Sequence, residues 1–233
     1  MAAMATAGRG EAGTARRARE PVAPGDVTVV PANQASWADL KAIFGTTDQG
    51  HCSCQRFKTT GWFWAQATDE GRRQQFRDQV NCDDRHAAST TGLVAYLREP
   101  DGTSVPVGWV AVEPRTEYPR LLALRRTWTG RPDEDKDDDS VWSVTCFAVR
   151  QGYRKRGISY ALAAATIPYA KAGGARAVEG YPMITQPGKE VTWGELHVGA
   201  RQVFEEAGFT EVSHPTPRRV VMRVDFGPAT VDG

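Results

Sequence analysis

The chain has 233 residues, with 29 lysines and arginines against 28 aspartates and glutamates, and a formal net charge of +1. This length allows one domain with a substantial core, and the balanced charge argues against a general nucleic-acid-binding surface. No apolar run approaches the roughly 18 residues of a membrane-spanning helix, so we expect no membrane partner.

The first part of the chain differs in composition from the rest. Residues 1–25 are largely alanine, glycine and arginine and contain almost nothing to bury. We expect a disordered tail there and an ordered domain over residues 26–228. The domain is predicted to begin with a β-branched strand over 26–30, followed by a helix over 33–44 whose apolar positions share one face.

The segment over residues 50–64 is irregular and unusually aromatic, and we interpret it as a loop that lines a site. Its cluster Trp62-Phe63-Trp64 is compatible with core packing and with the lining of an acceptor pocket, and both alternatives stay open. A surface helix over 69–80 is expected next, because Thr68 is of a residue type that caps helix N-termini.

A hairpin and an acidic block follow. Strands over 92–97 and 105–112 are predicted to pair, because Asp101-Gly102 between them is a strong turn signal. Residues 133–139 are mostly acidic. Such a block is usually a solvated loop, and binding of a cationic substrate is the alternative.

The chain is organised around the stretch from residue 141 to residue 172. An unbroken apolar strand over 141–149 leads into a loop that carries Arg154, Lys155, Arg156 and Gly157, and the loop opens into an alanine-rich helix. The first turn of a helix has unpaired N–H groups and partial positive charge, so this order of elements predicts an anion site that suits phosphate.

Two phosphate-binding interpretations compete for this loop. Residues 152–159 read G-x-x-x-x-G-I-S, one residue away from the nucleotide-binding pattern G-x-x-x-x-G-K-[ST]. The lysine that would reach the terminal phosphates is replaced by Ile158, which carries no charge. A nucleoside triphosphatase is therefore disfavoured.

The remaining elements complete a mixed α/β pattern. A strand is predicted over 175–181, a helix over 200–207 and two terminal strands over 210–212 and 220–226. Pro168 lies inside the central helix and predicts a kink or break in the four residues before it.

Two motifs resemble the GCN5-related N-acetyltransferase (GNAT) superfamily. The run Val149-x-Gln151-x-x-Arg154-x-x-Gly157-Ile158-Ser159 is similar to that family's acyl-CoA pyrophosphate loop. The run Ala200-x-x-Val203-Phe204-Glu205-x-x-Gly208-Phe209 is similar to a second family segment. The resemblance covers about residues 26–226 and implies the GNAT-type α/β fold, a central mixed sheet flanked by helices.

The resemblance also implies a cosubstrate, acetyl-CoA, and a set of residues that bind it. The loop would hold the pyrophosphate, and the end of the 141–149 strand would pair with the pantetheine arm and aim an N–H group at the acetyl carbonyl. The residues implied are Phe147, Val149, Arg154, Lys155, Arg156, Gly157, Ile158 and Ser159.

Acetyl transfer to an amine also needs a group that takes the amine's proton and a proton for the departing thiolate. Glu179 is the first candidate for the base, and Glu113 is the second. Many family members place a tyrosine acid where this chain has Phe204, which has no proton to give. Either Tyr181 substitutes, or solvent protonates the thiolate.

The chain has four cysteines. His51, Cys52, Cys54 and Cys82 form a conceivable zinc set, but the C-x-C spacing is atypical, and we expect reduced cytoplasmic thiols and no metal. Cys146 is expected to be a small buried residue rather than a nucleophile.

These inferences predict a cytoplasmic, acetyl-CoA-dependent N-acetyltransferase that acetylates a primary amine of a small molecule by direct attack in a ternary complex. Acetylation of a protein N-terminus or lysine is one alternative, and a non-catalytic acyl-CoA-binding regulatory domain is another. We expect no nucleic-acid partner and leave a homodimer open.

Overall fold

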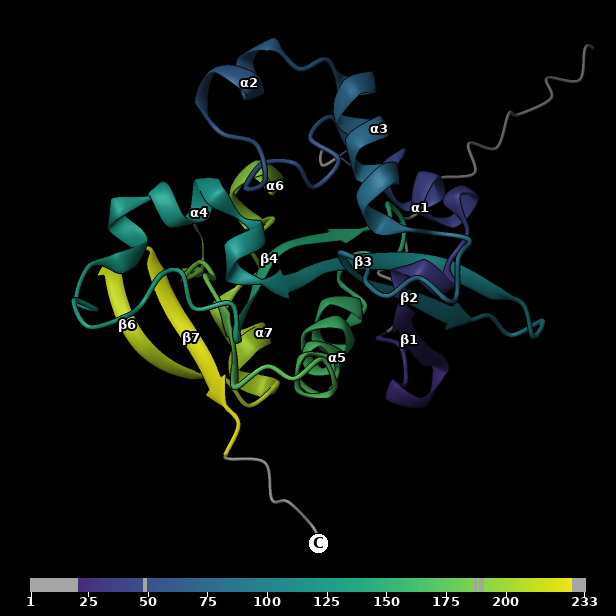
Figure 1. Cartoon of the computed structure of the whole chain (residues 1–233). Coiled ribbons are helices and arrows are strands. Elements are labelled where there is room, and N and C mark those ends of the chain that lie inside the picture. Colours follow the sequence, from purple (N-terminus) through teal and green to yellow (C-terminus); the bar gives the residue numbers. More distant parts are fainter. Residues whose placement is uncertain (1–20, 48–49, 187, 189–190, 228–233) are drawn as a thin grey trace, which may run out of the picture.

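The computed structural model describes residues 21–47, 50–186, 188 and 191–227. They form a mixed α/β fold around a seven-stranded sheet of order β1-β2-β3-β4-β5-β7-β6 (Figure 1). The strands are β1 Val27–Pro31, β2 Gly92–Arg98, β3 Ser104–Pro114, β4 Val141–Val149, β5 Ala177–Gly180, β6 Thr210–Thr216 and β7 Arg219–Asp225. Neighbouring strands are antiparallel except β4 and β5, which are parallel.

Helices cover both faces of the sheet. Helices α5 and α7 lie on one side, and α1, α3, α4 and α6 lie on the other (Figure 1). The α-helices are α1 Trp37–Phe44, α2 Gly61–Gln66, α3 Asp69–Val80, α4 Pro119–Ala123, α5 Ile158–Ala172, α6 Trp193–Leu196 and α7 Arg201–Glu206. The short 3-10 helices are η1 Pro24–Asp26, η2 Ala32–Gln34, η4 Arg115–Glu117 and η5 Arg125–Trp128.

The two faces of the central strands build two separate cores. In β2, Leu93 and Ala95 pack in the cluster that includes α5 and α7, whereas Val94 packs in the cluster that includes α1 and α3. Successive side chains of a strand point to opposite faces, so a strand covered on both sides reads as continuously apolar. This is the physical reason why β4 is apolar on both faces except for the buried Ser143 and Thr145.

The sheet opens between β4 and β5. Only the first part of β4, from Val141 to Val144, pairs with β5. A register shift follows, because Val112 of β3 lies opposite Val144 and Ala111 lies opposite Cys146. Beyond this bulge, the amide of Phe147 donates a hydrogen bond of 2.6 Å to the carbonyl oxygen of His197, a residue outside the strands.

The predicted α/β fold and order of elements are confirmed, and the departures are local. Helix α3 begins after Thr68, whose side chain accepts a hydrogen bond from the Gly71 amide. Helix α5 continues through Pro168, so the predicted break is wrong.

The described structure begins inside the predicted tail. The amide of Val22 donates to the carbonyl oxygen of Arg156 at 3.0 Å, and the side chain of Val22 packs against the main core. These contacts join Val22, which was predicted to lie in the tail, to the domain. Residues 1–20, the rest of the predicted tail, lie outside the described residues.

The aromatic cluster on α2 has another role than those considered, whereas the acidic block is mostly the exposed loop that was predicted. Trp62 and Phe63 lie on α2 with 71% and 68% of their surface exposed, so they do not pack in the core, and they line neither of the two cavities described below. In the acidic block, Glu134 and Asp138 form ion pairs with arginines of this chain. Those two carboxylates are therefore already neutralised within the fold.

Candidate active site

The loop between β4 and α5 has the backbone geometry of an anion site. Gly152, Lys155 and Gly157 have φ angles of 91°, 61° and 91°, in the left-handed region. Gly157 is the N-cap of α5, and no side chain caps the helix there. The N–H groups of the first turn are therefore directed towards the loop without a side-chain acceptor, which favours binding of a phosphate group.

Ile158 contributes to this site through its backbone alone. Its side chain is 1% exposed and belongs to the main core. A Cβ atom on Gly108 of β3 would lie 2.7 Å from Cγ2 of Ile158, so α5 packs closely on the sheet at this point. A lysine at 158 would have to bury its charge in that contact, so the position does not suit the lysine of a triphosphate-binding loop.

Phe147 and Phe204 fill the space beside the opening of the sheet. Their rings meet edge to face with centroids 5.7 Å apart, and Phe204 is fully buried. A Cβ atom on Gly180 would lie 2.1 Å from Cε1 of Phe204, so β5 accepts this ring only because residue 180 is glycine. Phe204 is a packing residue in this structure.

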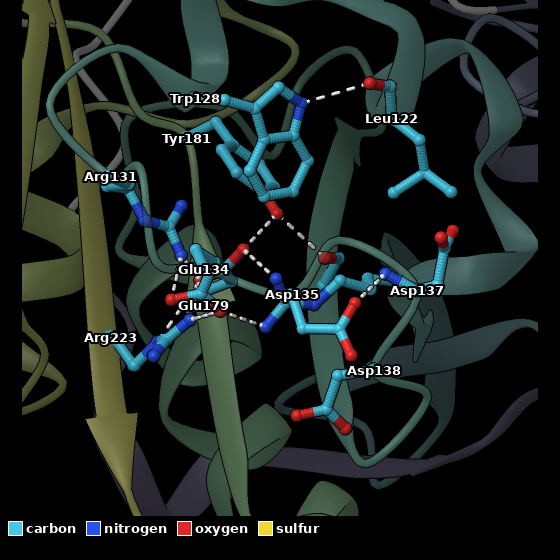
Figure 2. A network of polar contacts seen from close by, with 12 residues as sticks. Leu122, Trp128, Arg131, Glu134, Asp135, Asp137, Asp138, Glu179, Tyr181 and Arg223 are labelled. Carbon is cyan, nitrogen blue, oxygen red and sulfur yellow. Dashed lines mark hydrogen bonds and ion pairs between the residues drawn. The ribbon is translucent and has the colours of Figure 1, made fainter.

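Glu179 lies in a buried network of ion pairs (Figure 2). Its side chain is inaccessible to solvent, and Oε2 accepts hydrogen bonds from Nη2 of Arg131 at 2.8 Å and from Nη2 of Arg223 at 2.7 Å. Its Oε1 accepts from the Tyr181 hydroxyl at 2.5 Å. Both oxygens are occupied and shielded, so the placement argues against the prediction that Glu179 is the general base.

Glu134 closes the same network, which we call the buried arginine network: Arg115, Arg131, Arg223, Glu134 and Glu179. Glu134 bonds Arg115 and Arg223, each at 2.6 Å. Burial alone would raise the pKa of Glu134, but the hydrogen bonds from Arg223 and Arg115 outweigh it and lower the pKa to about 2. Three guanidinium groups thus share two carboxylates in the interior.

The two other predicted proton-transfer groups are also engaged. Burial and the nearby Glu179 charge raise the pKa of Tyr181 well above its usual value, and its hydroxyl lies 2.8 Å from the Ser143 hydroxyl. Glu113 forms an ion pair of 2.7 Å with Lys58. Burial raises the pKa of Glu113 although Lys58 opposes the shift.

A cavity of about 610 Å³ lies next to the opening of the sheet. Its wall comes from residues 56–57, from α4 and η5, from the residues after β5, from α6 and the residues after it, and from the β6–β7 hairpin. Tyr181 and His197 line it. His197 therefore connects the cavity to the opening of the sheet: it lines the cavity, and its carbonyl oxygen accepts a hydrogen bond from the Phe147 amide of β4 beyond the bulge. We call this space the β5 cavity.

His197 is a functional candidate that the sequence reasoning missed. It is 6% exposed, its Nδ1 lies 2.7 Å from the Gly194 carbonyl oxygen, and its ring stacks on Phe57. Burial, with the charges of Arg56 and Arg219, lowers the pKa of His197 to about 4. The ring is therefore neutral at pH 7, with Nδ1–H donated to Gly194. Nε2 carries the lone pair and has no hydrogen-bond partner among the described residues.

A second cavity, of about 380 Å³, lies between α1 and α3 and is separate from this site. It is lined by residues such as Trp37, Phe44 and Asp69, none of which borders the opening of the sheet. His51, one of the conceivable zinc ligands, instead pairs with Asp69 at 2.7 Å. Within the described ranges, no group of three or more His, Cys, Asp or Glu side chains is arranged to hold a metal ion.

Cys54 and Cys146 are buried and contribute to packing. The Sγ atom of Cys54 accepts a hydrogen bond of 2.9 Å from Nε1 of the buried Trp109. A hydrogen bond with Cys54, together with burial, raises the pKa of Cys146 well above its usual value, which disfavours a thiolate nucleophile. Among the helices of the described residues, none is both long and apolar enough to cross a membrane.

Solved structures with a similar fold are distant from this chain. A GCN5-related N-acetyltransferase from Kribbella flavida is 19% identical, with 88% of this chain and 100% of that chain covered and a TM-score of 0.47. A GNAT-family acetyltransferase from Bacillus anthracis is 11% identical, with 86% and 95% covered and a TM-score of 0.46. The ribosomal-protein-S18-alanine N-acetyltransferase from Escherichia coli is 13% identical, with 88% and 97% covered and a TM-score of 0.43. At these values they say nothing about substrate or mechanism.

No curated protein matches the chain in sequence. The family model described as the Acetyltransferase (GNAT) family matches residues 57–181, which is more than half of the chain. This match includes the strand β4, the phosphate loop and α5. The chain therefore belongs to the GNAT acetyltransferase family.

Proposed function

We propose that the protein transfers an acetyl group from acetyl-CoA to a primary amine of a small molecule, by direct attack in a ternary complex. One observation carries this proposal: β4 ends in the phosphate loop and, beyond its bulge, borders the β5 cavity through His197. A thioester held along β4 would thus meet an amine held in that cavity, without a covalent enzyme intermediate.

In this proposal, the cosubstrate is bound mainly by the loop. Arg154, Lys155 and Arg156 supply positive charge, and the amides of Gly157, Ile158 and Ser159 supply donors for the pyrophosphate. The backbone from Phe147 to Val149 would pair with the pantetheine arm. The Phe147 amide can serve as an oxyanion donor only after the His197 carbonyl releases it, so binding should shift the segment around His197.

His197 replaces Glu179 as our candidate for the proton acceptor. A base must be unprotonated, and the neutral His197 ring lines the cavity with its Nε2 unpartnered among the described residues. Nε2 itself is buried, so an amine reaches it only if the segment around His197 shifts, as release of the Phe147 amide also requires. The nearby arginines also lower the pKa of a bound amine, because they disfavour an ammonium group. Both effects raise the share of the neutral, nucleophilic amine.

Neither of the two groups considered as the acid, among the residues that the structure describes, can protonate the departing thiolate. Phe204 carries no proton, and the Tyr181 hydroxyl is committed to Glu179. Protonation by solvent is sufficient, because a thiol has a pKa of about 8.5 and its anion is a moderate base.

Phe147 and Phe204 support a second candidate function, that of a non-catalytic acyl-CoA-binding domain. The occupied Phe147 amide and the buried Phe204 ring are the observations that favour it. Such a domain would bind CoA through the loop and never release its thiol in the presence of an amine.

Release of free CoA thiol from acetyl-CoA, measured with a panel of small amines, tests the proposal. We expect amine-dependent release, and loss of at least about tenfold in kcat/KM for acetyl-CoA in Arg154→Gln, which removes a charge from the loop. Arg98→Gln, at the far end of β2, is the matched control. CoA binding without turnover of any amine would favour the non-catalytic domain.

A further inference from the structure

The β5 cavity carries an unusual excess of one charge. Its lining contains six arginines, Arg56, Arg120, Arg125, Arg126, Arg218 and Arg219, and Glu195 is the only carboxylate among its described lining residues. Since the whole chain has a net charge of only +1, these cations have been concentrated at one place by the fold.

The arginines come from three separate parts of the chain. Arg56 precedes α2, three others lie on α4 and η5, and Arg218 and Arg219 lie at the β6–β7 turn. Only the fold brings them together. Guanidinium groups that gather around one cavity repel one another, and such an arrangement is typical of a site that binds an anion.

Ion pairs within the chain leave most of this charge uncompensated. Glu195 pairs with Arg218 at 3.1 Å. For the other five arginines of the cavity, no carboxylate of the described residues lies within ion-pair distance. Arg219 is half-buried, and burial together with the charges of Arg218 and Arg56 lowers its pKa. A partly buried guanidinium without a counter-ion is unfavourable, and a bound anion removes that cost.

The cavity also has an apolar part and a neutral base. Leu121, Met183 and Val198 are apolar members of the lining, and the His197 ring belongs to the same lining, with its unpartnered Nε2 buried. The volume of about 610 Å³ falls in the usual range of about 300 to 1,000 Å³ for small-molecule sites. The cavity can therefore hold an amine, a short carbon chain and a charged group together.

We infer that the acceptor is a small primary amine that carries an oxyanion, a carboxylate or a phosphonate or phosphate group, and that Arg219 and Arg56 bind this group. The inference rests on the proposed function and adds the class of acceptor. Arginine binds planar and tetrahedral oxyanions through paired hydrogen bonds, which distinguishes such acceptors from neutral amines and diamines.

A bound oxyanion also acts on His197. The charges of Arg56 and Arg219 are among the causes that disfavour protonation of its ring. An anion that neutralises these two arginines makes His197 a stronger base when the acceptor is present. An acceptor without the anion leaves the ring less able to take a proton.

The test compares four amines of equal chain length: an aminoalkylphosphonate, an aminoalkanoate, an amino alcohol and a diamine. Free CoA thiol is measured for the full chain, for Arg219→Gln and Arg56→Gln, and for Arg98→Gln as the control outside the cavity. We expect at least about a tenfold preference in kcat/KM for the anionic amines, lost in both cavity variants and kept in the control. The better of the two anionic amines identifies the oxyanion.

A second measurement does not depend on turnover. The aminoalkylphosphonate should raise the melting temperature of the wild type and of Arg98→Gln, and not that of Arg219→Gln. If no amine is acetylated, the proposed function fails, and this shift still decides the inference. Equal use of all four amines, preference for the diamine or the amino alcohol, or an equal shift in Arg219→Gln would each overturn it.

Discussion

Two groups of arginines in this molecule show opposite solutions to the same physical problem. In the buried arginine network, three guanidinium groups surround the carboxylates of Glu134 and Glu179. In the β5 cavity, the described lining has six arginines and one carboxylate. Tyr181 connects the two regions, because it lines the cavity and donates its hydroxyl to Glu179. Arginines on one side of Tyr181 thus stabilise the fold through ion pairs, and arginines on the other side, in our proposal, bind a ligand.

The difference lies in how far the charge is compensated. A buried guanidinium needs a partner in the folded chain itself, since water cannot reach it. A guanidinium at a solvent-accessible cavity can remain without a partner until a ligand arrives. Removing one carboxylate from the network should therefore lower the stability of the protein much more than removing one from the cavity.

The largest effect is expected for Glu179→Gln. It leaves Arg131 and Arg223 with less compensation in the interior, and we expect a loss of about 3–5 kcal/mol in the free energy of unfolding. Glu195→Gln removes the cavity carboxylate, which is 39% exposed, and should change the free energy of unfolding far less, because an exposed ion pair contributes little. Urea unfolding of the two variants measures both values. A stable but inactive Glu179→Gln protein would restore Glu179 as the base.

A matched pair of arginine substitutions tests the cationic side of the same comparison, one in the network and one in the cavity. Arg131→Gln removes a hydrogen bond from Glu179 in the network and should lower stability by roughly 2–4 kcal/mol. Arg219→Gln removes a half-buried charge without a carboxylate partner, and stability should be unchanged or slightly higher. Thermal unfolding without ligand compares them, and a large loss in Arg219→Gln would mean that this residue is part of the fold's own compensation.

The stability contributions of His197, in the cavity, and of Glu134, in the network, should depend on pH in different ranges. Its pKa is about 4 in the folded chain, below the 6.5 of an exposed histidine, so the unfolded state binds more protons between these values. Stability should fall by at most about 3 kcal/mol as the pH decreases from 6.5 to 4, and His197→Asn should flatten this part of the curve. The network responds in a lower range, because Glu134 loses its contribution as the pH falls from 4.5 towards about 2.

The same variant separates a base from a packing residue. If Nε2 takes the proton, His197→Asn should lower kcat by about 100-fold, and the acid limb of the rate profile should change. The KM for acetyl-CoA should change little. Unchanged kcat with the altered stability curve would mean that the histidine only packs.

The smallest expected effect is that of salt concentration on the KM for the acceptor. Because the cavity arginines are accessible, raising the salt concentration from ~0.05 to ~0.5 M should increase the KM for an anionic amine a few-fold. The KM for the amino alcohol should not change. Urea midpoints of the network variants should keep their order over the same range, since buried pairs are screened much less.

The sequence by itself determined the parts of this protein that depend on neighbouring residues. The apolar run of β4, the basic glycine loop and the start of α5 follow one another in the chain, so backbone rules were sufficient to predict an anion site there. The order of strands and helices followed from similar local periodicities. With the two motifs, this was enough for the GNAT fold.

Only the tertiary structure decided the roles of the charged side chains. Glu179 and Arg131 are 48 residues apart, and Glu179 and Arg223 are 44 apart, so no local pattern could show that Glu179 is enclosed. The six cavity arginines are invisible in a net charge of +1, because composition adds charges without regard to position. His197 stands outside any motif, and its pKa depends on burial and on arginines from two other segments. Electrostatic energies depend on distance and solvent access in the folded chain, and these quantities arise only when remote segments meet.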